Sequence, residues 1–379
     1  MSVCGAGPGM RYSVRMLRPR LVAVIVTLLF APLAVAGSVA ESIGSPEGAR
    51  VAYPMPEGER PTLTFIARPL EPEQLADLER VAPNVRIVVA SSPEGALTLA
   101  PEAHGIDGRL ATPEVVAASP DLVWVQSPSA GVDRYLDNEP LMSTDRIVLT
   151  NMRAVHGPTI ADHSFAMLLM LTRNMRVHES NQREREWDRG EARAGIALEG
   201  RTMFVVGLGG IGTEIARRAD GFGMRVIASR RSDKPAPDFV DRVGKPDDLY
   251  EMLAEADVVA IALPLTPETE GMFDEKAFAA MKNGAFLLNV GRGRIVDTNA
   301  LMAALDSGRL AGAGLDVTDP EPLPEDHPLW GYEQVVITPH TAAVADLTRE
   351  RWWALYRENI RRFGAGEPLL NTVDKAAGY

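Results

Sequence analysis

Short runs of apolar residues alternate with amphipathic stretches along much of the chain. An apolar run at 63–67 precedes a helical pattern at 73–81, and further apolar runs follow at 85–89 and 122–126. Apolar runs that alternate with helical patterns predict parallel strands joined by helices. We therefore expect a small parallel α/β unit in this part of the chain.

The alternation becomes more regular after Arg201. Continuous apolar runs are expected for strands that are buried on both faces of a sheet. After a strand that ends at Val206, such runs occur at 224–228, 258–263, 285–290, 310–317 and 335–338. This regular pattern predicts a second, larger parallel sheet.

Three further segments lie outside these runs. Residues 160–175 are apolar at helical spacing, which predicts a helix buried between two domains. Residues 181–193 are charged, and we expect them to be exposed. Residues 351–364 form an amphipathic pattern with two adjacent tryptophans, which predicts a helix that returns to the first unit.

A glycine-rich turn follows the strand that ends at Val206. It has the pattern Gly-x-Gly-x-x-Gly and opens onto a helical stretch at 213–222. In this context the first glycine allows a tight turn, the second lets the backbone approach a pyrophosphate, and the third lets the helix pack on the strand. Free N–H groups at the helix start face the phosphates. A dinucleotide site is favoured over an ordinary strand–turn–helix corner, and its residues are Gly207, Leu208, Gly209, Gly210, Ile211 and Gly212.

The residues that end the next strand bear on the choice of dinucleotide. An NAD site usually carries Asp or Glu here, about 20 residues after the first glycine, to bind the ribose 2′-OH. This chain has Ser229, Arg230 and Arg231 instead. Arginine pairs with a 2′-phosphate, which an acidic residue would repel. We predict a preference for NADP(H), with NAD(H) also accepted; the alternative is that both arginines are solvated surface charges.

Three loops after predicted strands carry ionisable residues. Reduction of a ketone by hydride needs a proton donor for the forming alkoxide and a cation for the carbonyl oxygen and a carboxylate. Histidine and arginine supply both, and a neighbouring carboxylate stabilises the imidazolium. Taken alone, a histidine, arginine or glutamate in such a place more often has a structural or surface role. Their shared place at strand ends of one sheet favours function, and the residues are Arg292, Asp316, Glu321 and His340.

These loops, together with segments 126–133, 263–269 and 366–371, resemble those of the D-isomer-specific 2-hydroxyacid dehydrogenases. That family includes glyoxylate/hydroxypyruvate reductases and D-3-phosphoglycerate dehydrogenase. The similarity runs from about residue 103 to the C-terminus and comprises several separate motifs in the same order. It implies an α/β fold of two Rossmann/flavodoxin-like parallel-sheet domains with a cleft between them. The substrate domain would span 62–155 and be completed by 346–379, and the NAD(P)-binding domain would span 156–345.

The resemblance also implies roles for individual residues. Arg292 would bind the substrate carboxylate and carbonyl oxygen, and His340 would donate the proton in reduction and accept it in oxidation. Glu321 would hydrogen-bond to His340, and Asp316 would orient the nicotinamide carboxamide. The backbone N–H groups of Ala130 and Gly131 would hold the substrate carboxylate across the cleft. Further cofactor contacts would come from Leu263, Pro264, Thr269, Val290, Gly291 and His340.

The implied activity is the reversible NAD(P)-dependent reduction of small 2-keto acids, such as glyoxylate and hydroxypyruvate, to D-2-hydroxy acids. Glu321 argues against the formate-oxidising branch, in which glutamine stands at this position. Arg230 replaces the family's usual acidic residue and supports NADPH. No metal is implied, and a homodimer through the long helices of the cofactor domain is expected. The alternative is a non-catalytic, nucleotide-sensing binding protein with the same fold.

The net charge of −12 and pI of about 5.1 argue against a nucleic-acid partner, because no basic face is evident. An anionic substrate must therefore depend on a few local cations.

The N-terminus has a composition of its own. Residues 1–36 contain four arginines, no acidic residue and an apolar run at 21–36, which is typical of a signal peptide or membrane anchor. Residues 37–61 are rich in Gly, Pro, Ser and Glu and are interpreted as a linker. We expect an exported or membrane-anchored protein that contacts a membrane only through this segment, or a cytoplasmic protein if translation starts later. Cys4, the only cysteine, lies in the leader.

Overall fold

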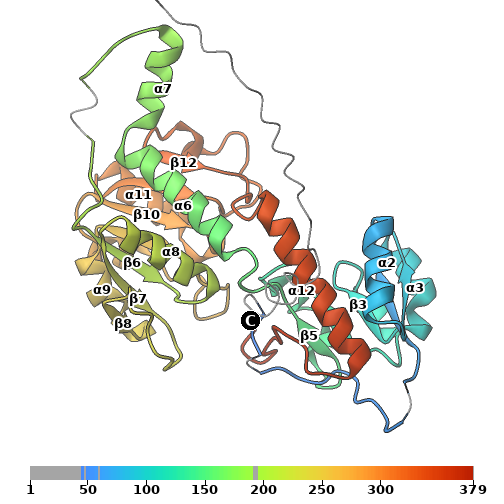
Figure 1. The fold of residues 1–379 in the computed structure, drawn as a ribbon. Coiled ribbons are helices and arrows are strands. Elements are labelled where there is room, and N and C mark those ends of the chain that lie inside the picture. Colours follow the sequence, from blue (N-terminus) through green and yellow to red (C-terminus); the bar gives the residue numbers. More distant parts are fainter. Residues whose placement is uncertain (1–43, 47, 59, 191–194, 379) are drawn as a thin grey trace, which may run out of the picture.

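The computed structural model describes residues 44–46, 48–58, 60–190 and 195–378, which form two parallel sheets flanked by helices (Figure 1). The first sheet has five strands in the order β2-β1-β3-β4-β5, and the second has seven in the order β12-β11-β10-β9-β6-β7-β8. The paired strands of both sheets are parallel. The predicted fold class, with two parallel-sheet α/β domains, is confirmed.

The five-stranded sheet contains two strands that the sequence predicts with the same bounds, β1 and β2. Proline in the first turn and a polar side chain at the N-cap start several of its helices, as Ser92 does for α3 and Thr112 does for α4. The strands are β1 Leu63–Ala67, β2 Val85–Val89, β3 Gly105–Asp107, β4 Trp124–Gln126 and β5 Val148–Thr150. The helices are α2 Pro72–Val81, α3 Pro93–Leu99, α4 Pro113–Ala117, α5 Glu139–Met142 and α12 Asp346–Ala365.

Three strands of the seven-stranded sheet, β6, β9 and β10, are buried along their whole length, as the continuous apolar runs predict. Its strands are β6 Thr202–Val206, β7 Arg225–Ser229, β8 Arg242–Gly244, β9 Val258–Ile261, β10 Ala285–Asn289, β11 Leu310–Leu315 and β12 Val335–Ile337. Its helices are α6 Gly157–Thr172, α7 Met175–Glu184, α8 Gly210–Gly221, α9 Leu249–Glu255, α10 Glu275–Ala280 and α11 Thr298–Asp306.

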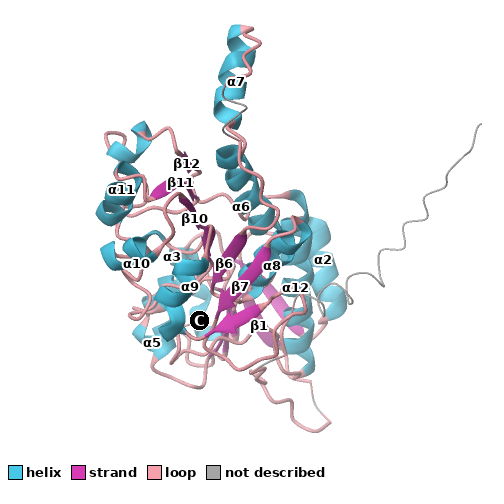
Figure 2. Ribbon diagram, turned by 90° about the vertical axis from the view of Figure 1, so that its left-hand side faces the viewer, coloured by secondary structure: helices cyan, strands magenta, loops and turns pink. Residues whose placement is uncertain are grey.

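The helical pattern at 160–175 forms α6, which ends at Thr172, and Met175 begins a second helix, α7. Asn174 has a left-handed backbone with φ of 50° and separates α6 from α7. The buried side of α6 packs against the seven-stranded sheet, whereas the sequence predicts a helix buried between domains. Glycines in β11 explain this, because a Cβ at Gly314 would come within 2.9 Å of the Met167 Cβ. Helix α7 has no buried residue and projects from the body (Figures 1 and 2).

Helix α12 returns to the five-stranded sheet, as predicted. Its Tyr356 and Phe363 are buried in the same cluster as Trp124 of β4. The described part of segment 37–61 also lies on this domain, because the carbonyls of Ser45 and Arg50 accept hydrogen bonds from the C-terminal segment. This stretch is therefore fastened to the first sheet's domain rather than spanning freely, as a linker would.

The predicted leader at 1–36, with Cys4, lies outside the described residues, as does the start of the predicted linker up to residue 43. Among the helices that the structure describes, none combines the length and the apolar character needed to span a bilayer.

Candidate active site

The glycine-rich turn has the geometry that a pyrophosphate site requires. Gly207 has φ of +103°, and a Cβ there would lie 2.7 Å from the Ala262 carbonyl oxygen. A Cβ at Gly212 would collide with the Gly207 carbonyl. Gly209, the N-cap of α8, faces open space, with no atom within 4 Å of where its Cβ would be. No side chain caps the helix, so the N–H groups of its first turn stay available to an anion.

The loops after β9 and β10 lie beside this turn. Thr269 Oγ1 donates to the Pro264 carbonyl at 2.7 Å, which holds the β9 loop in a tight bend. A Cβ at Gly291 would lie 2.8 Å from the Leu263 carbonyl oxygen, and Val290 is buried. The structure thus brings the predicted cofactor residues of β6, β9 and β10 to one edge of the sheet, where ligands bind in open parallel sheets.

The predicted 2′-phosphate residues end β7 at the same edge. The Ser229 carbonyl accepts hydrogen bonds from the N–H groups of Gly207 and Leu208, which ties this strand end to the glycine turn. Arg230 Nε is buried and has no hydrogen-bond partner in the part of the chain that the structure describes. A buried donor without a partner is costly, so a phosphate oxygen at this place fits the residues present.

Lys245, which the sequence analysis did not single out, lies close to the residues that follow β7. It follows β8, and its Nζ donates to the Arg231 carbonyl at 3.0 Å. Its hydrogen bond to Asp233 lowers the pKa of that carboxyl. The three-residue strand β8 is too short to show a period in the sequence, so nothing pointed to the residue that follows it.

His340 and Glu321 meet, as the sequence predicts. The His340 Nδ1 and Glu321 Oε1 are 2.7 Å apart, and the two side chains are 45% and 41% exposed. His340 has a left-handed backbone with φ of 54°, and its N–H donates to the Asp316 carbonyl at 2.8 Å. The Glu321 bond leaves the other ring nitrogen, Nε2, as the atom that can exchange a proton with a substrate.

Asp316 holds the loop that carries His340. Its carboxylate is almost fully buried and accepts hydrogen bonds from Thr338 Oγ1 at 2.6 Å and from the Thr341 N–H at 2.9 Å. His163 Nε2 lies 2.9 Å from the same Thr338 hydroxyl and extends the network into α6. The orientation of a nicotinamide carboxamide by Asp316 stays a prediction, and the structure adds that this residue fixes the His340 backbone.

Arg292 extends from the seven-stranded sheet's domain to the loop after β4. Its Nη2 and Nε donate to Asp133 Oδ1 at 2.9 and 3.2 Å. A Cβ at Gly131 would collide with the guanidinium, so any other residue there would force the Arg292 side chain to move. The N–H groups of Ala130 and Gly131 have no hydrogen-bond partner among the described residues. Asp133 lies within the Gln126–Asp133 segment that carries the family resemblance, yet the sequence offered no role for it.

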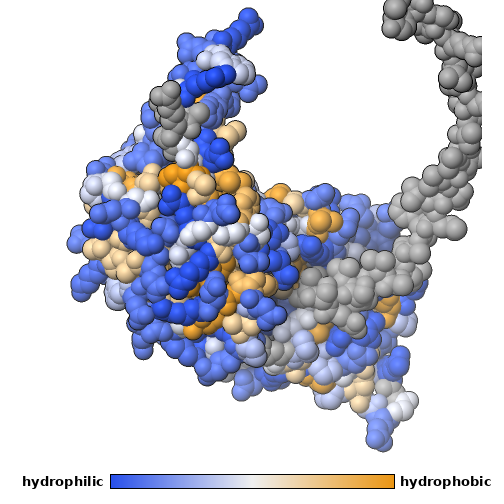
Figure 3. Space-filling model, turned by 60° about the vertical axis from the view of Figure 1, so that its left-hand side comes forward, coloured by the Kyte–Doolittle hydropathy of each residue, from blue (hydrophilic) through white to orange (hydrophobic). Residues whose placement is uncertain are grey.

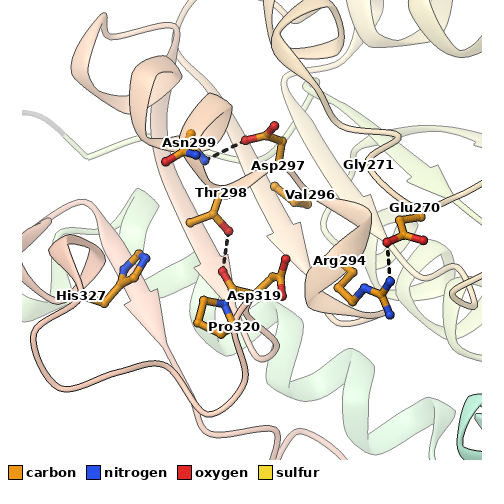
Figure 4. Close-up of a pocket in the computed structure, with 10 residues that line it drawn as sticks. All are labelled: Glu270, Gly271, Arg294, Val296, Asp297, Thr298, Asn299, Asp319, Pro320 and His327. Carbon is orange, nitrogen blue, oxygen red and sulfur yellow. Dashed lines mark hydrogen bonds and ion pairs between the residues drawn. The ribbon is translucent and has the colours of Figure 1, made fainter.

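The structure also has a polar cavity of about 430 Å³ (Figure 4). It is lined by the start of α11, the Glu270–Arg294 ion pair, Asp319, Pro320 and His327. None of the predicted site residues lines it. In the described ranges, no group of three or more His, Cys, Asp and Glu side chains is placed to hold a metal ion.

Comparison with known proteins matches residues 165–342 to the NAD binding domain of the D-isomer specific 2-hydroxyacid dehydrogenases. A glyoxylate reductase of Korarchaeum cryptofilum is 38% identical over 269 residues, which cover 69% of this chain and 79% of that protein. The chain belongs to the D-isomer specific 2-hydroxyacid dehydrogenase family. It is therefore an oxidoreductase of 2-hydroxy acids that uses a nicotinamide cofactor, and its relatives include glyoxylate reductases and D-3-phosphoglycerate dehydrogenases.

Solved structures of two relatives of this dehydrogenase agree. A D-isomer specific 2-hydroxyacid dehydrogenase of Xanthobacter autotrophicus, in complex with NADPH and MES, is 30% identical with a TM-score of 0.68, covering 84% of this chain and 100% of that one. An NADPH-dependent glyoxylate/hydroxypyruvate reductase of Sinorhizobium meliloti, in complex with NADP and sulfate, is 27% identical with a TM-score of 0.69, with coverages of 84% and 100%.

Proposed function

We propose that this dehydrogenase reduces small 2-keto acids, such as glyoxylate and hydroxypyruvate, to D-2-hydroxy acids, and that it prefers NADPH to NADH. One arrangement carries the proposal. Arg292, Glu321 and His340 follow the adjacent strands β10, β11 and β12, and Arg292 reaches the loop with the unpartnered N–H groups of Ala130 and Gly131.

Each of these residues has a separate role in the proposed reaction. The N–H groups of Ala130 and Gly131 hold the substrate carboxylate, and Arg292 binds both that carboxylate and the carbonyl oxygen. The nicotinamide, when bound, supplies the hydride. His340 Nε2 gives its proton to the forming alkoxide, while Glu321 on Nδ1 keeps the ring oriented and stabilises its charge. Asp316 keeps His340 in place through the loop that it anchors.

The proposed preference for NADPH rests on the basic residues that follow β7 and β8. The unpartnered Nε of Arg230 suits a 2′-phosphate oxygen, and Lys245 adds a second cation close to Arg231. The Xanthobacter autotrophicus relative was solved with NADPH. A phosphate gains charge-assisted hydrogen bonds here that a bare ribose hydroxyl does not.

We also propose that the protein is a homodimer formed through the cofactor domain. Trp187, just after the projecting α7, is 89% exposed, and Met175 at its start is 47% exposed. Figure 3 shows apolar surface gathered below this helix. Sedimentation of the full-length protein should give twice the chain mass, and Trp187→Ser should weaken the association. A monomer at micromolar concentration contradicts this proposal.

The localisation is a separate proposal. The arginine-rich, apolar leader at 1–36 supports export or anchoring. Fractionation of the native host, with a deletion of residues 1–36 as control, should place the full chain outside the cytoplasm or in the membrane and the shortened chain in the cytoplasm. Full-length protein found only in the soluble cytoplasm contradicts it.

The experiment that tests the function is NADPH oxidation by purified full-length protein across glyoxylate, hydroxypyruvate, pyruvate and phenylpyruvate, with NADH in parallel. We expect turnover of the small keto acids and a higher kcat/KM with NADPH. Protein that is folded and binds NADPH, yet turns over none of these acids, contradicts the proposal.

A further inference from the structure

One short segment of the chain contacts both halves of the candidate site. Residues 151–156, here called the connector, join β5 of the five-stranded sheet to α6, which packs on the seven-stranded sheet. The connector is hydrogen-bonded to the loop after β4 at residues 127–131, here called the substrate loop. It also packs against the glycine-rich turn. The proposed reaction gives the connector no role.

Two donors of the connector hold two successive carbonyls of the substrate loop. The Met152 N–H donates to the Ser129 carbonyl at 3.0 Å, and Asn151 Nδ2 donates to the Ala130 carbonyl at 2.9 Å. Asn151 is 5% exposed, and its Oδ1 accepts a hydrogen bond from the Arg153 N–H at 3.1 Å. Both the nitrogen and the oxygen of its amide are therefore engaged, which fixes the orientation of the side chain.

These two bonds decide which way the unpartnered N–H groups of the substrate loop point. In a planar trans peptide, the C=O of one residue and the N–H of the next point in opposite directions. The Ser129 carbonyl shares a trans peptide unit with the Ala130 N–H, and the Ala130 carbonyl shares the next with the Gly131 N–H. Because both carbonyls face the connector, both N–H groups face away from it. Successive N–H groups that face the same way form a place for one anion, such as a carboxylate.

The connector also packs against Gly210, the first residue of α8. A Cβ at Gly210 would lie 3.2 Å from the backbone N and Cα of Ala154, and a Cβ at Gly157 would lie 2.9 Å from the Gly210 carbonyl oxygen. Ala154 has φ of 71°, in the left-handed region that favours glycine, so its surroundings must hold it there. A pyrophosphate bound at this turn would fix Gly210 and, through it, the connector. NADPH and NADH share the pyrophosphate, so this effect does not depend on the 2′-phosphate.

We propose that Asn151 is a positioning residue for the substrate carboxylate, and that the connector transmits the binding of the cofactor to the substrate loop. The proposal deepens the proposed function and rests on it for the role of the Ala130 and Gly131 N–H groups. Asn151 acts by holding the Ala130 carbonyl, so that the Gly131 N–H is turned toward the carboxylate before the substrate binds. A connector that is fixed by bound cofactor holds the loop more firmly, so cofactor and substrate each tighten the binding of the other.

The test measures the affinity for oxamate, an unreactive analogue of a 2-keto acid that keeps its carboxylate. Titration calorimetry of the full-length protein, with and without saturating NADPH, gives two dissociation constants for each variant. We expect NADPH to tighten the binding of oxamate to wild type about tenfold. Asn151→Ala should weaken oxamate binding about tenfold in the presence of NADPH and at most about threefold in its absence. The affinity for NADPH alone should stay within about twofold, because the glycine-rich turn is unchanged.

Two further variants separate positioning from general stability. Asn84→Ala is the matched control: Asn84 precedes β2 at the opposite edge of the same sheet, and its Nδ2 donates to the Gly364 carbonyl at 2.9 Å. It should lower the melting temperature and leave both oxamate constants unchanged. Ala154→Gly keeps the backbone conformation without strain but loosens the connector, so it should reduce the effect of NADPH on oxamate binding.

Three results would overturn the proposal. An oxamate constant of Asn151→Ala that equals the wild-type value in the presence of NADPH overturns the positioning role, and so does an equal loss in Asn84→Ala. An effect of NADPH on oxamate binding that keeps its wild-type size in both Asn151→Ala and Ala154→Gly overturns the transmission through the connector.

Steady-state kinetics separate this proposal from the proposed function. With hydroxypyruvate and NADPH, Asn151→Ala should raise KM about tenfold and lower kcat less than about threefold, because it weakens substrate binding and leaves the reacting groups in place. Turnover by wild type with an unchanged KM for Asn151→Ala overturns the positioning role and leaves the reductase standing. Wild-type protein that turns over no keto acid, but whose oxamate binding depends on Asn151, overturns the reductase and leaves the positioning role standing.

Discussion

The carboxyl edges of the two sheets hold their polar groups in different ways. At the edge of the seven-stranded sheet, groups are fixed by close contact: Gly207 fits against a carbonyl, and buried Asp316 accepts hydrogen bonds from the His340 loop. At the edge of the five-stranded sheet, the polar groups are mostly exposed arginines and unpartnered N–H groups. Reacting groups must be positioned to within a fraction of an ångström. At the edge of the seven-stranded sheet they lie on loops that are held by hydrogen bonds and by glycines in close contact with other backbone atoms.

The largest effect should come from the seven-stranded edge. His340→Gln should lower kcat about 100- to 10,000-fold, because the proposed reaction takes the proton for the alkoxide from His340. The affinity for NADPH, measured by fluorescence, should stay within about threefold, since the glycine turn is untouched. His178→Gln on α7 is the matched control and should behave as wild type. If kcat of His340→Gln is close to that of wild type, His340 is not the residue that transfers the proton.

The second largest effect is expected for a substitution that disturbs the contact between Arg292 and the loop after β4. Gly131→Ala places a methyl group where the Arg292 guanidinium lies, so kcat/KM for the keto acid should fall about 100-fold. Gly221→Ala, where a Cβ meets no atom within 4 Å, is the control and should leave kcat/KM unchanged. If Gly131→Ala is as active as wild type, Arg292 does not need to lie against this loop during the reaction.

The choice of cofactor should depend on the seven-stranded edge alone. Arg230→Ser should lower the NADPH-to-NADH ratio of kcat/KM about 10- to 100-fold, because a charge-assisted hydrogen bond to the 2′-phosphate is lost. Initial rates with both cofactors measure this, and Arg173→Ser supplies the charge control. An unchanged ratio would assign Arg230 to the solvated surface, the alternative that the sequence leaves open.

The smallest effect is expected for Lys245→Gln. Lys245 already bonds to Asp233 and to the Arg231 carbonyl, so its contribution to a 2′-phosphate is shared with these partners. The cofactor ratio should fall about threefold. A loss as large as that of Arg230→Ser would show that Lys245, and not Arg230, is the main phosphate ligand.

The sequence predicts the residues at the edge of the seven-stranded sheet better than those at the edge of the five-stranded sheet, for a physical reason. Long buried strands and a constrained glycine turn leave patterns over many residues, so β6, β10 and the residues after them are recognisable. Strands β3 and β8 have three residues each and are not part of a longer apolar run, so they leave no pattern, and Lys245, which follows β8, was missed with it. The contact of Arg292 with Asp133 joins residues 159 positions apart, which no local pattern encodes.

The break between α6 and α7 was missed for a related reason. Asn174 takes a left-handed conformation within a stretch that keeps its helical composition on both sides. Asparagine tolerates that conformation better than most residues, yet it also occurs inside helices. Met167 and Leu171 of α6 lie against Gly314 and Gly312 of β11, a contact between distant residues that no local pattern encodes.

The division of labour between the two edges is tested most directly by one set of kcat/KM values. Wild type, Arg230→Ser and Gly131→Ala would each be measured with hydroxypyruvate and with NADPH and NADH. We predict that Arg230→Ser changes only the NADPH-to-NADH ratio and that Gly131→Ala lowers kcat/KM for hydroxypyruvate equally with both cofactors. If Gly131→Ala alters the cofactor ratio, or if Arg230→Ser lowers kcat/KM for hydroxypyruvate with NADH, the two edges do not act separately.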